Sequence, residues 1–312
     1  MIKLFNIPDY IINTSTFSNK INDPCVEMFE SKFANYVGAK YACGFSSATN
    51  AIFLTFLNKK QDVSVPSMIP PVVLNALING GNKIKFTDNV NWVGNSYVLH
   101  EFKDFKVIDS AQKVERNQFT NEANDEDLMI FSFYPTKPVG SLDGGIIVSN
   151  DKEKIDYFKK AVMNGMGYEE NSWERKVFFP GWKMYLNSFQ AYVANENLKV
   201  LDKKQKRLSE VREFYNSELG YKNTSNHLYR INVKNRIEFI QNLKINKIST
   251  GIHYSANHKI DIYKKHSICE TYMPLTELEE LTTVSIPFHE NLTNDEVDYI
   301  IKCCKETGKL CK

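Results

Sequence analysis

The chain has 312 residues, of which 42% are hydrophobic and 24% charged, values that are typical of a globular protein. Its 39 Lys and Arg residues nearly balance 37 Asp and Glu residues, and the net charge of +2 argues against a nucleic-acid-binding or polybasic membrane-surface protein. No apolar run reaches the length of about 18 residues that a membrane span needs. Pro8 and Asp9 interrupt the segment that would be apolar in a signal peptide. The six cysteines include no CxxC pair, so we expect free thiols, no metal site and a cytoplasmic location.

Helices and strands alternate over the first half of the chain. The first predicted helix begins at Asp23 and Pro24, a suitable N-cap and first helical residue, and ends at Gly38. The run 128–133 (LMIFSF) is apolar throughout, as is typical of a strand buried on both faces of a parallel sheet. Further strands are predicted over 41–44, 63–65, 83–87, 97–102, 106–108 and 145–149, and further helices over 50–57, 72–78 and from residue 151.

A long helix and a small α+β region are predicted next. Residues 187–219 contain little Gly or Pro, and their charged run is typical of the solvated face of a helix that connects two domains. Strands are then predicted over 227–233, 249–254 and 283–287, with a helix over 236–243 and a closing helix that Thr293 and Glu296 begin as a capping box. We therefore predict three parts: a large α/β domain (1–186) with a mostly parallel sheet flanked by helices, a connecting helix (187–220) and a small α+β domain (221–312).

Four polar clusters follow predicted strands, and open α/β sheets bind ligands at the carboxyl ends of their strands. The turn 46–49 (SSAT) could hold an anion with its amides or could simply cap the next helix. Asp109, which has Gln112 three residues later, could pair with a cationic ring nitrogen or a metal, or could cap a turn. Ser132 ends the apolar strand, and Lys137 could be a solvated surface residue or an amine that condenses with carbonyl groups.

The segments around these clusters resemble the DegT/DnrJ/EryC1/StrS family of nucleotide-sugar aminotransferases, which use pyridoxal phosphate. FSFYPTKPVGSLDGGIIVSND is similar to the family's cofactor-lysine segment, VEMFESKFANYVGAKYACGFSSATNAI to its first helix and phosphate turn, and KVIDSAQ to its strand ending in Asp and Gln. GWKMYLNSFQAYVA resembles the segment lent to the partner subunit, and GIHYSANHKIDIY and ELTTVSIPFHENLTNDEVDYI resemble the C-terminal domain. The resemblance covers about residues 24 to 305 and implies a fold-type I pyridoxal-phosphate-dependent transferase.

The resemblance also implies roles for single residues. Lys137 would bind the cofactor covalently and move a proton between cofactor and substrate. Asp109 would keep the pyridine nitrogen protonated, and Gln112 would flank the ring's phenolic oxygen. The phosphate would be held by Ala48, Thr49 and Ser132.

Other implied roles involve a second subunit and the substrate. Lys183 would reach the phosphate from the partner subunit, which implies a homodimer with shared active sites. His253, Tyr254 and His258 would approach the sugar nucleotide, although strand-end and loop residues of these types are also common in packing and on surfaces.

Three features depart from the family pattern. Pro70 stands where an aromatic ring usually stacks on the cofactor, and a proline ring offers less polarizable area there. Residues 88–106 form a shorter stretch than in the family, and Tyr185 replaces a polar Asn or Arg. Lys137 itself argues against the branch of the family in which histidine replaces lysine and the enzyme is a dehydratase.

The resemblance thus implies transfer of an amino group, with glutamate as the expected donor, to a keto group of a nucleotide-linked deoxysugar. Two alternatives stay open: an aminotransferase acting on a cyclitol or another ketone, and a non-catalytic relative that binds a sugar nucleotide. A dinucleotide-dependent oxidoreductase is disfavoured because no GxGxxG follows a predicted strand.

Overall fold

The computed structural model describes residues 1–312 except 20, 22, 169–173, 269–271 and 312, so Cys269 lies outside the described residues. The chain divides into two compact units, which we call the sheet unit (9–55 and 96–199) and the second unit (1–8, 56–95 and 200–312). The predicted domain boundaries at residues 186 and 220 stay a prediction.

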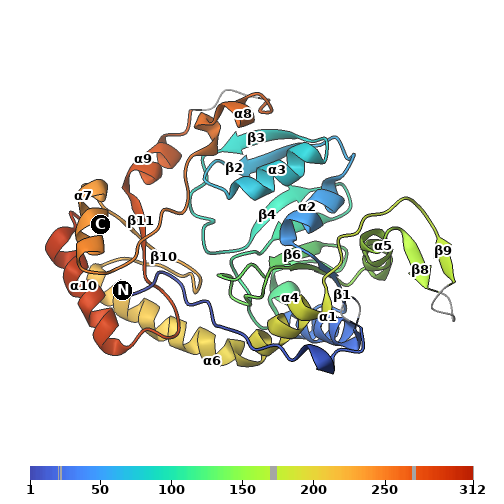
Figure 1. The fold of residues 1–312 in the computed structure, drawn as a ribbon. Coiled ribbons are helices and arrows are strands. Elements are labelled where there is room, and N and C mark those ends of the chain that lie inside the picture. The colour runs from blue at the N-terminus through green and yellow to red at the C-terminus, as the bar shows by residue number, and fades with distance from the viewer. Residues whose placement is uncertain (20, 22, 169–173, 269–271, 312) are drawn as a thin grey trace. The chain divides into compact units, whose positions relative to one another are not determined.

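A mixed five-stranded sheet forms the centre of the sheet unit (Figure 1), with the strand order β1-β7-β6-β5-β4. Its strands are β1 (Tyr41–Phe45), β4 (Tyr97–Glu101), β5 (Lys106–Asp109), β6 (Leu128–Ser132) and β7 (Gly145–Ser149). Only β5 and β6 pair in parallel among these neighbours, whereas a mostly parallel sheet was predicted. The reason is that residues 102–105 and 133–144 join consecutive strands without a crossover helix, and such connections produce antiparallel pairs. The predicted α/β class is confirmed.

Helix α1 (Pro24–Val37) begins and ends where the sequence predicts. The Asp23 side chain accepts a hydrogen bond from the amide of Cys25, and Gly38 ends the helix in the left-handed conformation. Phe33 of this helix packs edge-to-face against Phe131 of β6, with ring centroids 5.0 Å apart. The unit also contains η1 (Thr14–Thr16), α4 (Gln118–Glu122), α5 (Lys152–Val162) and the hairpin strands β8 (Met166–Tyr168) and β9 (Arg175–Val177).

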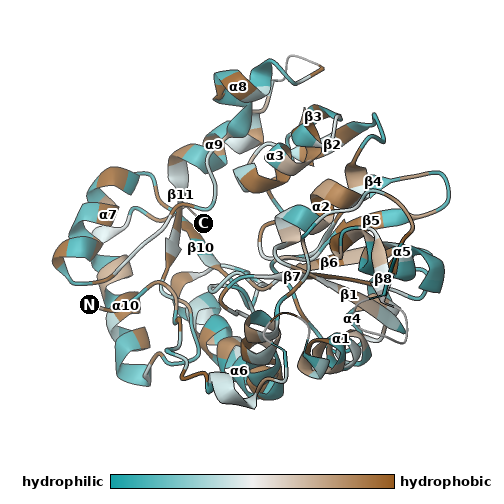
Figure 2. Ribbon diagram, turned by 45° about the vertical axis from the view of Figure 1, so that its right-hand side comes forward, coloured by the Kyte–Doolittle hydropathy of each residue, from teal (hydrophilic) through white to brown (hydrophobic). Residues whose placement is uncertain are grey.

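Two helices cross the boundary between the units, namely α2 (Ala48–Phe56) and the long α6 (Ser188–Leu219). In Figure 2 helices α5 and α6 carry long hydrophilic stretches, whereas the strands around β6 are apolar. This contrast agrees with the complete burial of β6 and β7. Among the described residues no helix is both long and apolar enough to span a bilayer.

The second unit contains two strand pairs. β2 (Asp62–Pro66) and β3 (Lys83–Thr87) run parallel, and β10 (Tyr229–Asn232) and β11 (Thr283–Ile286) run antiparallel. The helices are α3 (Pro71–Asn79), α7 (Arg236–Ile245), α8 (Asp261–Lys264), α9 (Pro274–Thr282) and α10 (Asn294–Thr307), together with η2 (Asn257–Lys259). The capping box of Thr293 and Glu296 is confirmed at the start of α10.

One predicted strand is absent from the second unit. Among the described residues, 249–254 make a single bridge, between Gly251 and Ser285, and no other strand pairing. Gly251 approaches Leu4 so closely that a Cβ there would lie 2.7 Å from a Leu4 methyl carbon. The N-terminal residues therefore occupy the space beside this segment.

Candidate active site

Three strands bring predicted site residues to one edge of the five-stranded sheet. The last residue of β1 pairs with Gly145, which on its other side pairs with Ser132 at the end of β6. Asp109, the last residue of β5, pairs with Ile130, two residues before Ser132. The carboxyl ends of β1, β5 and β6 therefore meet at the same edge, which is where α/β sheets bind ligands.

The turn after β1 has the geometry of an anion site. Ser47 caps α2 by accepting a hydrogen bond from the amide of Asn50 (3.2 Å). In the part of the chain that the structure describes, the amides of Ala48 and Thr49 have no acceptor, as expected in the first turn of a helix. Unpartnered amides and the positive end of the helix dipole together favour a bound anion.

Gly145 supports this turn, and the sequence analysis did not single it out. A Cβ on Gly145 would lie 2.4 Å from the nitrogen and 2.6 Å from the Cα of Ala48, both backbone atoms that cannot move away freely. Only glycine therefore allows β7 to lie this close to the turn. The GG pair of the lysine segment is visible in the sequence, but its contact with residue 48 depends on strand register.

Asp109 is buried, with 4% of its surface exposed, and both of its carboxylate oxygens accept hydrogen bonds. The amide of Ala111 donates to Oδ1 and the hydroxyl of Tyr97 donates to Oδ2, each at 2.9 Å. Burial raises the pKa of Asp109, while these two donors and the positive charge of Lys137 act in the opposite direction. Tyr97 was not predicted as a site residue, because its contact depends on the pairing of β4 with β5.

Lys137 lies in the loop between β6 and β7, close enough to Asp109 for the two charges to interact. Burial of the amine lowers the pKa of Lys137 to about 8, although the Asp109 carboxylate opposes the shift. An amine with this pKa is neutral in about a tenth of the molecules at pH 7, against about 1 in 3000 for an ordinary lysine. The structure therefore places an amine of enhanced nucleophilicity beside a buried carboxylate.

The lysine loop packs closely on itself and is held to α6 at Gly140 and Ser141. Gly140 lies against Pro135 so closely that a Cβ would be 2.3 Å from the Pro135 carbonyl oxygen. The hydroxyl of Ser141 donates to the carbonyl of Gln190 in α6 (2.7 Å), and the Asn197 side chain, also in α6, donates to the carbonyl of Gly140. These contacts hold the loop on rigid elements, which a precisely positioned amine requires.

The remaining predicted cofactor residues of the sheet unit differ in exposure. Ser132 and Gln112 are buried, and the Ser132 hydroxyl accepts a hydrogen bond from the amide of Tyr134 (3.3 Å). Lys183 is exposed, and the next residue, Met184, accepts a hydrogen bond from the amide of Ser46 through its carbonyl (2.7 Å). The role of Lys183 in a partner's site stays a prediction.

Pro70 belongs to the second unit and ends a loop that two residues of η2 hold in place. Asn257 donates its side-chain amide to the carbonyls of Ser67 (2.8 Å) and Ile69 (2.6 Å). Nδ1 of His258 lies 2.7 Å from the hydroxyl oxygen of Ser67. The loop before Pro70 and the predicted substrate residue His258 therefore form one hydrogen-bonded cluster.

The other two predicted substrate residues also have intramolecular contacts in the second unit. Nδ1 of His253 lies 2.8 Å from the hydroxyl oxygen of Ser285. The ring of Tyr254 stacks on Trp92, with centroids 6.1 Å apart and an interplanar angle of 8°. These contacts are compatible with a packing role as well as with substrate binding, so their assignment to the substrate stays a prediction.

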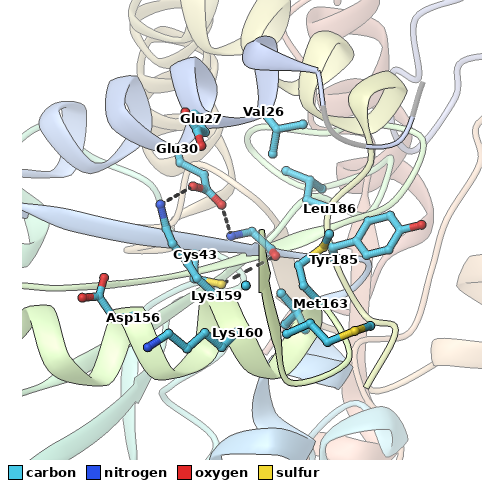
Figure 3. A pocket seen from close by; sticks show the side chains of 14 residues that line it. Val26, Glu27, Glu30, Cys43, Asp156, Lys159, Lys160, Met163, Tyr185 and Leu186 are labelled. Atoms are coloured by element: carbon cyan, nitrogen blue, oxygen red, sulfur yellow. Dashed lines mark hydrogen bonds and ion pairs between the residues drawn. The ribbon is translucent and has the colours of Figure 1, made fainter. Parts of the chain in front are cut away.

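A pocket of about 410 Å³ lies elsewhere in the sheet unit, between α1 and α5 (Figure 3), and no predicted site residue lines it. The carboxylate of Glu30 accepts a hydrogen bond from the amide of Gly44 (2.6 Å) and pairs with Lys159 at 3.0 Å. Cys43 lies beside this pair, and both burial and the Glu30 charge raise the pKa of its thiol. The polar groups at the base of the pocket are thus used by internal contacts. Among the described residues no cluster of His, Cys, Asp and Glu could hold a metal ion.

Solved structures share this fold. PseC of Helicobacter pylori, an aminotransferase of pseudoaminic acid biosynthesis, superposes with a TM-score of 0.78 at 18% identity, over 98% of this chain and 99% of that one. Spr1654 of Streptococcus pneumoniae, solved in its PMP (pyridoxamine phosphate) form, gives a TM-score of 0.79 at 16% identity, over 97% of this chain and 98% of that one. The predicted fold-type I architecture is confirmed.

The chain belongs to the DegT/DnrJ/EryC1/StrS aminotransferase family, whose model matches residues 11–89 and 118–305. A relative from Campylobacter jejuni, named UDP-4-amino-4,6-dideoxy-N-acetyl-beta-L-altrosamine transaminase, is 24% identical over 330 residues, covering 88% of this chain and 87% of that protein. The predicted family is confirmed, and the protein is an aminotransferase by family. Lys137 lies within the matched residues, whereas Tyr97, Asp109 and Gln112 lie in the unmatched stretch 90–117.

Proposed function

We propose that the protein is a pyridoxal-phosphate-dependent aminotransferase that moves an amino group from glutamate to a keto group of a nucleotide-linked sugar. The observation that carries the proposal is that the buried Asp109 carboxylate and the 46–49 turn lie at one edge of the sheet, with Lys137 close enough to Asp109 for their charges to interact. The names of the Campylobacter jejuni and Helicobacter pylori relatives support a nucleotide-sugar substrate.

The donor set fits pyridoxal phosphate. The amides of Ala48 and Thr49 and the hydroxyl of Ser132 suit a phosphate dianion, and Gly145 keeps the turn open to it. When bound, pyridoxal phosphate supplies an electron sink for the carbon from which a proton is removed. The PLP and PMP forms of the Streptococcus pneumoniae structure support this cofactor.

Asp109, Lys137 and Gln112 have separate roles in the proposed reaction. Asp109 would pair with the cationic ring nitrogen, because the hydrogen bonds that Ala111 and Tyr97 donate to its two oxygens favour the ionised carboxyl. The Nζ atom of Lys137 would hold the cofactor, and as a free amine with a pKa of about 8 it would take up and return a proton near neutral pH. Gln112 lies three residues after Asp109 and is proposed to donate toward the phenolic oxygen of the ring.

The proposed active unit is a homodimer in the cytoplasm, with Lys183 of each subunit completing the phosphate site of the other. The exposure of the Lys183 side chain supports this arrangement. Lys137→Ala and Lys183→Ala should each be nearly inactive alone, but mixing them with subunit exchange should restore about a quarter of the activity, because half of the dimers then carry one intact site. A mixture that stays inactive after verified exchange would contradict shared sites.

An absorption spectrum tests the proposal directly. Purified protein with added pyridoxal phosphate should show a visible band that bleaches with glutamate, and a nucleotide keto-sugar should restore the band. Lys137→Ala should lack the band, whereas Lys183→Arg should retain it. The proposed function would be wrong if the wild-type protein formed no band with excess cofactor, or if Lys137→Ala kept full turnover. A panel of cyclitol ketones and nucleotide keto-sugars would separate the two substrate classes.

A further inference from the structure

The carboxylate of Asp109 is held by a residue from the neighbouring strand. Tyr97 of β4 lies directly opposite Asp109 of β5 in the antiparallel register, so both side chains leave the same face of the sheet. The Tyr97 hydroxyl donates to Oδ2 of Asp109 at 2.9 Å, while the amide of Ala111 donates to Oδ1 at the same distance. The two donors therefore fix the orientation of the carboxylate from both sides.

We propose that Tyr97 is a positioning residue of the active site, whose hydroxyl keeps Asp109 oriented and ionised for the cofactor's ring nitrogen. The inference rests on the proposed function, because Asp109 needs a cationic partner for this role to matter. Each carboxylate oxygen accepts two hydrogen bonds, so one lone pair on each oxygen stays available after Tyr97 and Ala111 have donated.

The need for such a residue follows from the burial of Asp109. Removal from water favours the neutral acid, and the pKa of Asp109 is raised for this reason. The titratable groups that act on the carboxyl are Tyr97 from β4 and Lys137 from the β6–β7 loop. Lys137 acts on Asp109 through its charge, whereas the Tyr97 hydroxyl donates a hydrogen bond directly to Oδ2. Of these two side chains, Tyr97 is therefore the one that fixes the orientation of the carboxylate as well as favouring its ionised form.

Tyr97 also lies in the stretch 90–117, which the family model does not match. The hairpin of β4 and β5, joined by residues 102–105, is short, and its register alone brings the hydroxyl to the carboxylate. This hairpin therefore supplies a support for Asp109 from within a stretch that the family model does not match.

The test compares Tyr97→Phe with the wild type and with Tyr272→Phe, a matched loss of a hydroxyl at an 87% exposed position. The first measurement uses the cofactor-free protein with ¹³C-labelled aspartate, and the Asp109 carboxyl signal is assigned by its loss in Asp109→Asn. Loss of a hydrogen bond to the charged form should raise the titration midpoint of Asp109 by about one pH unit. Tyr272→Phe should leave the midpoint unchanged.

The second measurement is the affinity for pyridoxal phosphate. Tyr97→Phe should weaken binding about tenfold, and the same change in an Asp109→Asn background should have almost no further effect, because Tyr97 acts through Asp109. Incorporating 3-fluorotyrosine at position 97 makes the hydroxyl a stronger donor, so it should lower the titration midpoint of Asp109. This variant keeps the test valid if Tyr97→Phe folds poorly.

The inference is overturned if the Asp109 midpoint is the same in Tyr97→Phe and the wild type, or if Tyr97→Phe weakens cofactor binding equally in both backgrounds. Failure of the proposed function gives a different result: the wild-type protein would then bind no pyridoxal phosphate at all, while the titration of the cofactor-free protein would still report whether Tyr97 acts on Asp109.

Discussion

Replacement of Gly145 by alanine should weaken cofactor binding as well as the fold. The new Cβ would lie 2.4 Å from the amide nitrogen of Ala48, about 1 Å less than an ordinary contact of 3.4 Å, so the 46–49 turn must move by a similar distance. Overpacking of this kind costs about 1–3 kcal/mol of folding free energy. Displacing one amide that donates to a charged phosphate also weakens the free energy of cofactor binding by about 1.5–3 kcal/mol, which corresponds to a tenfold to hundredfold higher Kd.

The assay is a titration with pyridoxal phosphate followed by absorbance, together with the midpoint of thermal unfolding without cofactor. Gly167→Ala is the matched control, because its new Cβ would meet only the ring of Phe178 (3.0 Å), a side chain that is 46% exposed and can turn away. The control should bind the cofactor as the wild type does. If Gly145→Ala binds with wild-type affinity, whatever its thermal midpoint, the 46–49 turn does not hold the phosphate.

Three further results are expected. Because burial lowers the pKa of Lys137 to about 8, the rate at which its neutral amine captures pyridoxal phosphate should rise about tenfold per pH unit below pH 8 and level off above pH 8. Stopped-flow absorbance measures this rate, and a midpoint near pH 10.5 would contradict the lowered pKa. Asn257→Ala removes hydrogen bonds of 2.8 and 2.6 Å to two backbone carbonyls, so urea denaturation should show a loss of about 1–3 kcal/mol in the free energy of unfolding. The control Asn291→Ala, at an exposed position, should change this free energy little, and equal stability of the two variants would refute the reasoning. Thr293→Ala removes the cap of α10 and should lower the free energy of unfolding by about 1 kcal/mol, whereas Glu296→Gln can still complete a capping box and should lower it less. The reverse order would contradict a stabilising capping box.

Local signals in the sequence predicted the ends of several elements correctly. Asp23 caps α1 and Gly38 ends it in the left-handed conformation, and the capping box of α10 forms as predicted. Such signals act within a few residues, so they can be read without knowledge of the fold. The segment 249–254 shows the limit, because a strand predicted from its own residues still needs a neighbouring strand with which its backbone can pair.

The candidate site depends on contacts that no local signal encodes. The sequence and its family resemblance pointed to Lys137 and Asp109, and the structure brings these two charges together. It could not indicate Tyr97 or Gly145, because their contacts with residues 109 and 48 exist only in one register of the sheet. A shift of one residue would turn the Tyr97 ring to the opposite face.

The buried thiols provide a way to follow local opening of each unit separately. Cys43 lies in β1 with 1% of its surface exposed, and Cys304 in α10 is fully buried with a pKa of about 12. A thiol reagent needs an exposed thiolate, so it can modify either residue only after the surrounding packing has opened. Labelling at Cys43 therefore measures the opening free energy of the sheet unit, and labelling at Cys304 measures that of the second unit. Mass spectrometry of the two cysteine peptides over time would show whether the units exchange with solvent at one common rate or at two.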